Sequence, residues 1–123
     1  RVEPVAVGGD DHGYTRQGCV SWDPDSPYGQ GPTGIGLRTG TTQVRNDLAD
    51  DPKYLPWRAA VAQRGICCSI TLPVRVSGRM HGALMVYGRR PGEFGRLAQV
   101  MLEGLAADLG YGLERLADAK HQR

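Results

Sequence analysis

The residues best suited to nucleophilic or redox chemistry are three cysteines, Cys19 and the adjacent pair Cys67 and Cys68. Neighbouring cysteines rarely form a disulfide with each other, and the sequence contains neither a CxxC pair nor the Cys/His spacing of a zinc site. An odd cysteine count without disulfide-framework spacing is typical of a reducing compartment, so we expect a cytoplasmic protein. We interpret all three cysteines as buried or half-buried free thiols.

A glycine-rich segment, Gly29-Gln30-Gly31-Pro32-Thr33-Gly34-Ile35-Gly36, is a candidate phosphate-binding loop. It lacks the Gly-Lys-Ser/Thr ending of a P-loop. Gly29, Gly31 and Gly34 match the GxGxxG spacing of dinucleotide-binding proteins, but no clear strand leads into them within a βαβ unit. We therefore interpret the segment as a tight turn that feeds a short helix over residues 33–38, which stops at Gly40.

Length and charge limit what the chain can be. Its 123 residues suit one domain, and 15 basic against 13 acidic residues give a net charge of +2, which argues against a dedicated nucleic-acid binder. No apolar run reaches the ~20 residues of a membrane helix, so we expect no membrane insertion. The 18 glycines, about twice the usual share, predict short elements joined by sharp turns. Because the chain starts at Arg1 without a methionine, we expect a piece of a longer protein.

Alternating residues and turn signals predict the elements that position these groups. In chain order they are strands at 2–7 and 41–47, a helix from Pro56 to Gly65 that carries Trp57, and strands at 66–76 and 80–87. The segment 66–76 has the strongest strand pattern in the chain. Ser77-Gly78 follows it as a turn, so the last two strands are predicted to form a hairpin.

The rest of the chain predicts one long helix that begins near Phe94. Apolar residues then recur at steps of three or four, as on one helical face, at Leu97, Val100, Met101, Leu105, Leu109, Leu113 and Leu116. After Leu113 a thin apolar seam runs between charged residues, which is typical of helices that dimerise and connect to an output domain; a solvated helix end is the alternative. Glycines weaken a helix, so Gly104, Gly110 and Gly112 suggest the close approach of another element.

Several short motifs, in this order and spacing, resemble those of GAF domains. They are Ser21-Trp22-Asp23, Gly29-Gln30-Gly31-Pro32-Thr33-Gly34, Arg38-Thr39-Gly40, Asn46-Asp47, Asp51-Pro52, Trp57-Arg58, Ser69-Ile70-Thr71-Leu72-Pro73-Val74 and Gly82-Ala83-Leu84-Met85-Val86-Tyr87. The resemblance covers residues 2–116 and is nearest to GAF modules of bacterial sensor proteins, upstream of histidine kinases or diguanylate cyclases. It implies an α+β, PAS-related fold: an antiparallel sheet with helices on one face, a ligand pocket on the other and a long C-terminal helix.

The same resemblance implies domain boundaries. Residues 1–116 would form the GAF domain, and residues 117–123 would begin a linker or signalling helix. GAF domains usually start with a helix and a strand that lies centrally in the sheet, and nothing before Val2 corresponds to them. We therefore expect a domain without its first helix and strand, which would leave backbone groups of the sheet unpaired.

Alternation along the strand at 66–76 separates an aliphatic face from a polar one. The aliphatic face, expected to pack on helices, comprises Cys68, Ile70, Leu72, Val74 and Val76. The opposite face offers Cys67, Ser69 and Thr71, whose small polar side chains suit the wall of the implied cavity. With the wall of the partner strand and an expected lid, the candidate ligand-binding residues are Trp22, Tyr28, Asp47, Tyr54, Trp57, Cys67, Ser69, Thr71, Met85 and Tyr87. Ordinary packing is the alternative for each aromatic residue.

GAF domains serve several chemistries, each of which needs its own residues. A bilin-binding cysteine is usually followed by histidine, whereas Cys68 is followed by Ser69. His81 lies at a strand position that is usually aliphatic, so it does not favour a haem ligand. The Asn-Lys and Asp-Glu set of cyclic-nucleotide GAF domains is not found. The cofactor is therefore left unknown, with no motif for haem, bilin or cyclic nucleotide.

An enzymatic alternative is free methionine-(R)-sulfoxide reductase, which uses a thiolate nucleophile on a GAF fold. Thr33 stands where that enzyme needs a thiol, and Ala62 lies near the place of its other cysteine, so we expect no enzyme. The expected function is small-molecule sensing in a bacterial signalling protein, as a homodimer that passes ligand state through the C-terminal helix to a covalently linked output domain. The other alternative is a structural dimerisation module with a vestigial pocket.

Overall fold

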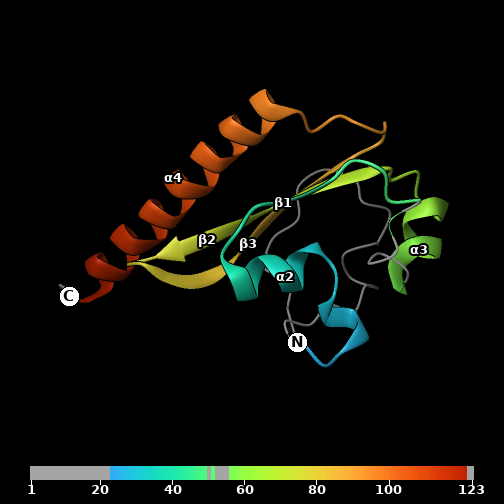
Figure 1. The fold of residues 1–123 in the computed structure, drawn as a ribbon. Coiled ribbons are helices and arrows are strands. Elements are labelled where there is room, and N and C mark those ends of the chain that lie inside the picture. Colours follow the sequence, from blue (N-terminus) through green and yellow to red (C-terminus); the bar gives the residue numbers. More distant parts are fainter. Residues whose placement is uncertain (1–22, 50, 52–55, 122–123) are drawn as a thin grey trace.

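The chain folds as a small antiparallel sheet between helices, which is the α+β architecture that the sequence predicts (Figure 1). The computed structural model describes residues 23–49, 51 and 56–121, so the predicted strand at 2–7 lies outside the described residues. The elements are η1 (Pro27–Gly29, a 3-10 turn), α2 (Pro32–Thr39), β1 (Gln43–Arg45), α3 (Arg58–Gln63), β2 (Cys68–Val76), β3 (Arg79–Gly88) and α4 (Arg96–His121).

Among the described residues, β2 is the central strand, with β1 on one side and β3 on the other, all antiparallel. Two cross-strand rows matter for the site: Arg45, Ser69 and Tyr87 form one, and Gln43, Thr71 and Met85 form the other. Residues two apart on a strand share a face, so both rows lie on the same side of the sheet. In Figure 1, α4 lies on one side of the sheet, α2 on the other and α3 near one end.

The hairpin forms as predicted, with Ser77 and Gly78 as its two-residue turn. Their φ angles are 53° and 78°, as in the turns whose twist matches that of two paired strands. The register is irregular between Val74 and Arg75, just before this turn. Val76 is only half-buried and lies outside the buried core, so the predicted aliphatic face effectively ends at Val74.

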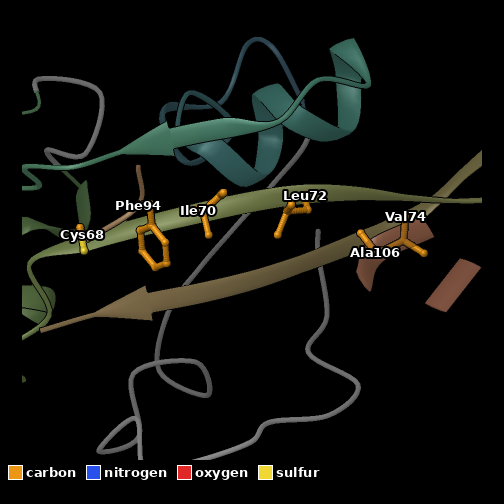
Figure 2. Packing of buried hydrophobic residues seen from close by; sticks show 6 residues of the cluster. All are labelled: Cys68, Ile70, Leu72, Val74, Phe94 and Ala106. Carbon is orange, nitrogen blue, oxygen red and sulfur yellow. The ribbon is translucent and has the colours of Figure 1, made fainter. Parts of the chain in front are cut away.

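The aliphatic face of β2 packs against α4, as predicted. The buried members of this core are Cys68, Ile70, Leu72, Val74, Phe94 and Ala106. Figure 2 shows the first four along β2, with Ala106 coming from α4 and Phe94 from the segment before it. Burying one large aliphatic side chain stabilises a fold by about 1.5–3 kcal/mol. This layer therefore decides which way β2 faces and sends Ser69 and Thr71 to the opposite side.

A second buried cluster joins α3 to the sheet. It comprises Leu48, Trp57, Val61 and Ile66, with Ala60 and Tyr87 packed against it. The helix is shorter than the predicted 56–65, because Trp57 occupies its N-cap position and Arg64 its C-cap position. Trp57 is nevertheless only 5% exposed. Burial of its ring therefore fixes the position of the chain at the start of α3.

The helix α4 forms where its periodicity predicts, but most of its predicted apolar stripe is exposed, and Leu113 is the member of that stripe that packs against the sheet core among the described residues. The side facing the sheet carries smaller or differently placed residues: Ala98, Leu102, Ala106, Gly110 and Leu113. The exposed stripe, called here the outer face, comprises Leu97, Val100, Met101, Leu105, Leu109 and Leu116. In the described ranges, each helix is too short or too polar to cross a lipid bilayer.

Gly110 is the point of closest approach between α4 and the sheet. A Cβ atom at this position would overlap the carbonyl oxygen of Arg75, whereas a Cβ at Gly112 meets no described atom within 4 Å. The prediction that α4 glycines allow close approach is thus confirmed at Gly110. It is not met at Gly104 or Gly112 among the described residues.

These two glycines give a matched pair of substitutions. Gly110→Ala is expected to lower the free energy of unfolding by about 1–3 kcal/mol, because the added methyl group forces α4 off Arg75. Gly112→Ala is expected to raise it by up to about 1 kcal/mol, since alanine is the better helix former at an open position. Urea unfolding at a fixed protein concentration measures both. Equal stabilisation by the two substitutions would contradict the close packing at Gly110.

Candidate functional site

Two buried hydroxyl groups are the centre of the candidate site. Ser69 and Thr71 are both 0% exposed, and neither Oγ of Ser69 nor Oγ1 of Thr71 has a hydrogen-bond partner in the part of the chain that the structure describes. A buried hydroxyl without a partner costs about 1–3 kcal/mol by the measure of mutational data. Two such hydroxyls on one strand face make this face a candidate site for binding a polar group.

Side chains from α2 and β3 surround these hydroxyls. The Thr33 hydroxyl in the first turn of α2 donates to Sδ of Met85 at 2.6 Å, and the Tyr87 hydroxyl lies 3.7 Å from the same sulfur. Met85 and Tyr87 are the β3 partners of Thr71 and Ser69. We call these five residues, Thr33, Ser69, Thr71, Met85 and Tyr87, the hydroxyl face.

The sequence explains why α2 begins above this face. Pro32 occupies the first turn, where its missing N–H costs nothing, and the helix stops at Gly40, as predicted. The N-cap residue is Gly31, which has no side chain to cap the helix. Thr33 and Gly34 are buried, so the uncapped end of α2 lies inside the protein rather than in solvent.

An aromatic wall stands beside the start of α2. The ring of Trp57 packs so near Gly31 that a Cβ there would lie 2.5 Å from Cζ3. The Tyr28 ring meets Trp57 edge-on, with centroids 6.3 Å apart and planes at 69°, a favourable aromatic geometry. A side chain at position 31 would clash with Trp57, so close packing requires glycine there. The rings of Trp57 and Tyr28 lie together beside the N-terminal end of α2.

Two arginines flank the other end of the hydroxyl face. Arg45, the β1 partner of Ser69, makes a 3.1 Å ion pair from Nε to Oδ2 of Asp51. Arg58 donates from Nη2 to the Asp51 carbonyl oxygen at 3.3 Å. Its Nε atom is buried and has no hydrogen-bond partner among the described residues. The Asp51 carboxylate thus pairs with Arg45, whereas Arg58 bonds to a neutral carbonyl oxygen, so these three residues together carry a net positive charge.

Six of the ten predicted site residues come together: Tyr28, Trp57, Ser69, Thr71, Met85 and Tyr87. Trp22 and Tyr54 lie outside the described residues. Asp47 is exposed, and no described contact joins it to the hydroxyl face. Cys67 precedes β2 and is half-buried, with its Sγ 3.9 Å from the Gly65 carbonyl oxygen.

Sequence reasoning assigned no ligand role to Thr33, Arg45 or Arg58. Alternation along β1 could have placed Arg45 on the side of Ser69, but only with the pairing register in hand. Placing Thr33 and Arg58 at the site would have required knowing how α2 and α3 pack against the sheet, which no local sequence pattern encodes. Their types and positions became informative only once the fold had brought them near the two hydroxyls.

The cysteine at the start of β2 lies on the α4 side of the sheet, away from the hydroxyl face. Cys68 is 0% exposed, and its Sγ donates to the Arg90 carbonyl oxygen at 3.1 Å. Burial raises the pKa of this thiol, and the negative charge of Glu93 adds to the rise. Since the thiolate is the reactive form, Cys68 is a poor nucleophile.

Alkylation tests this difference between the adjacent cysteines. In the folded protein, iodoacetamide at neutral pH is expected to modify Cys67 and to leave Cys68 unmodified, because Cys68 is fully buried and held in its thiol form. Fragment-ion mass spectrometry of the peptide that carries both residues distinguishes them. Modification of both in urea is the control, and native modification of Cys68 as fast as that of Cys67 would contradict its placement.

A groove of about 600 Å³ lies elsewhere, between α4, the end of β2 and the segment after α2. Its polar groups are largely engaged with each other: Thr42 donates to Glu103 at 3.1 Å, and Arg75 donates to the Gly40 carbonyl oxygen at 2.6 Å. The hydroxyl face, with buried polar atoms that lack partners in the described chain, is the stronger candidate for a ligand site.

Comparisons with known proteins agree with the fold. Residues 7–114 match the model of the GAF domain family. No curated protein matches the sequence significantly. Among solved structures, a domain assigned to a two-component sensor histidine kinase protein from Sinorhizobium meliloti 1021 has a TM-score of 0.67 and 22% identity, over 97% of this chain and 74% of that one.

Two further structures have the same fold. GAF3 from Slr1393 of Synechocystis sp. PCC6803, in its photoproduct state, has a TM-score of 0.67 and 18% identity, over 73% of this chain and 58% of that one. Free methionine-R-sulfoxide reductase from Neisseria meningitidis, in complex with its substrate, has a TM-score of 0.60 and 23% identity, over 75% and 53%. This chain thus spans less than two thirds of both proteins. Because the family model covers most of the sequence and the fold agrees with it, the chain belongs to the GAF domain family.

Proposed function

We propose that this GAF domain is a regulatory module that binds a small molecule at its hydroxyl face, in a bacterial cytoplasmic signalling protein of the histidine kinase or diguanylate cyclase type. The observation that carries the proposal is the pair of buried hydroxyls, Ser69 and Thr71, without partners in the described chain. Unpaired buried hydroxyls lower the stability of a fold, and a ligand that forms hydrogen bonds with them restores the stability that was lost. The sensor kinase structure of the same fold supports this context.

Strand β2 offers the physical link between ligand and helix. Thr71 lies on the hydroxyl face, while its neighbours Ile70 and Leu72 pack in the core against α4. A ligand that prefers one position of β2 would therefore favour one position of α4. Such a ligand shifts the population of two states only as far as its affinities for them differ.

The outer face of α4 is proposed to pair with a second copy of the chain. Its six large apolar residues are 43–73% exposed and follow one another along the helix, which is more than the scattered apolar residues of an ordinary surface. Gly104 lies on the same side with open space around it, so a second helix can approach closely. A homodimer through α4 would carry the ligand state into an output domain joined to this helix.

We further propose that the module is regulatory rather than catalytic. Structures with the same fold include free methionine-R-sulfoxide reductases, which are enzymes. In this chain Thr33 occupies the first turn of α2 over the hydroxyl face, and Cys68 faces α4 instead. Turnover of free methionine sulfoxide with a thiol reductant by the purified protein would overturn this part of the proposal.

The sensing proposal is tested by melting the protein with the low-molecular-weight fraction of its source cells. A rise in melting temperature is expected for the native protein, because a ligand that binds only the folded state stabilises it. Thr71→Val is expected to lose this rise, and Thr41→Val, the same change at an exposed threonine, is expected to keep it. No rise with any fraction, together with an intact dimer, would favour the structural dimerisation module, whose support is the outer face of α4.

A further inference from the structure

We propose that the ligand of the hydroxyl face is a small organic anion whose carboxylate binds between the first turn of α2 and the hydroxyls of Ser69 and Thr71. The inference rests on the proposed function and goes one step beyond it, to the chemical class of the ligand. Three independent properties of the described residues support it: the uncapped helix end, the number of converging donors and the balance of charge.

The start of α2 is a source of positive potential inside the protein. The first backbone bond of this helix is donated by Ile35 to the Gly31 carbonyl oxygen at 3.0 Å. The amides of Thr33 and Gly34 precede that bond, and no side chain caps the helix. A helix N-terminus carries the equivalent of about half a positive charge and offers its free amides to anions. Both residues are buried, so solvent screens this end poorly.

The hydroxyls beside this helix end can all donate to an anion. The Thr33 hydroxyl donates to the Met85 thioether, which is a weak acceptor, so a carboxylate oxygen would compete well for its proton. Ser69 and Thr71, on the adjacent strand, hold hydroxyls without partners in the described chain. Thr71 is paired with Met85, to which the Thr33 hydroxyl donates, and its Cγ2 methyl group faces the second turn of α2, 3.4 Å from where a Cβ on Gly36 would lie. A carboxylate accepts up to about four hydrogen bonds, which these donors can supply.

The balance of charge around the face favours a monoanion with an apolar body. Arg45 pairs with the carboxylate of Asp51, whereas Arg58 donates to the backbone carbonyl oxygen of Asp51, and the buried Nε of Arg58 lacks a partner in the described chain. Because both guanidinium groups are already directed to Asp51, the site lacks the free arginine pair that a phosphate usually takes. Trp57 and Tyr28, beside Gly31, supply apolar and aromatic surface for the rest of the ligand.

Matched pairs of compounds test the class directly. Binding of benzoate against benzamide and of isobutyrate against isobutyramide is measured by thermal shift and calorimetry at constant ionic strength, with nitrate and inorganic phosphate as further probes. At least one carboxylate is expected to bind more than about tenfold tighter than its amide, since charge-assisted hydrogen bonds are roughly twice as strong as neutral ones. Phosphate and nitrate are expected to bind more weakly than that carboxylate.

Substitutions on the hydroxyl face test where the carboxylate binds. Thr33→Val and Thr71→Val are each expected to weaken the carboxylate by about tenfold, the loss expected for one charge-assisted bond, and Thr41→Val is expected to leave it unchanged. The inference is overturned if no carboxylate binds at millimolar concentration. It is also overturned if a carboxylate binds and none of the variants of the hydroxyl face alters its binding. Equal binding of amide and carboxylate, or tighter binding of nitrate or phosphate, overturns it as well. If a neutral compound binds and Thr71→Val abolishes its binding, the anion is wrong while the sensing function stands.

Discussion

Replacing Thr71 by valine is expected to stabilise the ligand-free protein and to remove its response to ligand. Valine has nearly the shape of threonine, so the core stays filled, and the buried hydroxyl that lacks a partner in the described chain is gone. The expected gain is about 1–2 kcal/mol in the free energy of unfolding. Most substitutions of fully buried residues destabilise a protein, so the sign itself is informative.

Chemical denaturation of the variant and the native protein, with and without ligand, measures both effects. Thr41→Val makes the same change at an exposed threonine whose hydroxyl bonds to Thr39 and Gln43, and it should change unfolding by less than about 0.5 kcal/mol. Ser69→Ala should repeat the result of Thr71→Val on a smaller scale, since it also leaves a small space. A loss of stability in Thr71→Val would indicate that its hydroxyl already has a partner.

Introducing a charge on the outer face of α4 is expected to dissociate the dimer. Leu105 is 54% exposed in the single chain and lies near the middle of that face. In a pair of helices, the carboxylate introduced into each copy would lose its hydration against apolar side chains, so Leu105→Glu should weaken association by about a hundredfold or more. Sedimentation equilibrium at several protein concentrations measures the dissociation constant.

Ala107→Glu is the matched control for this change. It adds the same charge to an exposed position of α4 beside the groove, on the opposite side of the helix from Leu105, and it should leave association within about threefold of the native value. Circular dichroism should find α4 folded in both variants, because both substituted side chains are exposed in the single chain. A monomeric native protein, or a dimer that Leu105→Glu does not weaken, would contradict pairing through this face.

Local patterns were enough to predict the hairpin and the two faces of its first strand. Ser77-Gly78 specifies the turn through its backbone conformation, and the period of two in β2 sends Ile70 and Thr71 to opposite sides. These features depend on neighbours in the sequence. They therefore do not depend on how distant parts of the chain meet.

Local sequence patterns did not predict which face of α4 packs on the sheet. Its leucine period predicted a helix, yet Ala106 and Gly110 face the sheet, while Leu105 and Leu109 face outward. Close packing requires small residues where α4 crosses β2, so the more hydrophobic outer face of α4 points away from the sheet. The stripe alone could not reveal this, because both faces of the helix contain apolar residues.

Most of the candidate site was predictable from the strands and from the aromatic residues Tyr28 and Trp57, whereas Thr33 on α2 was not. Ser69, Thr71, Met85 and Tyr87 follow from alternation across the hairpin. Thr33 reaches this face only through the path of α2, which is set by packing over the sheet rather than by local preference. For the same reason the electrostatic character of the site emerged from the structure alone.

The central claim is that the hydroxyl face holds the ligand, and native mass spectrometry tests it most directly. The full-length protein and its Ser69→Ala/Thr71→Val double variant are each mixed with the low-molecular-weight extract of the source cells and sprayed from volatile buffer. The native protein is expected to carry a small-molecule adduct that the double variant lacks, while both stay folded. An adduct of the same mass and occupancy on both proteins, or none on either, would contradict the assignment.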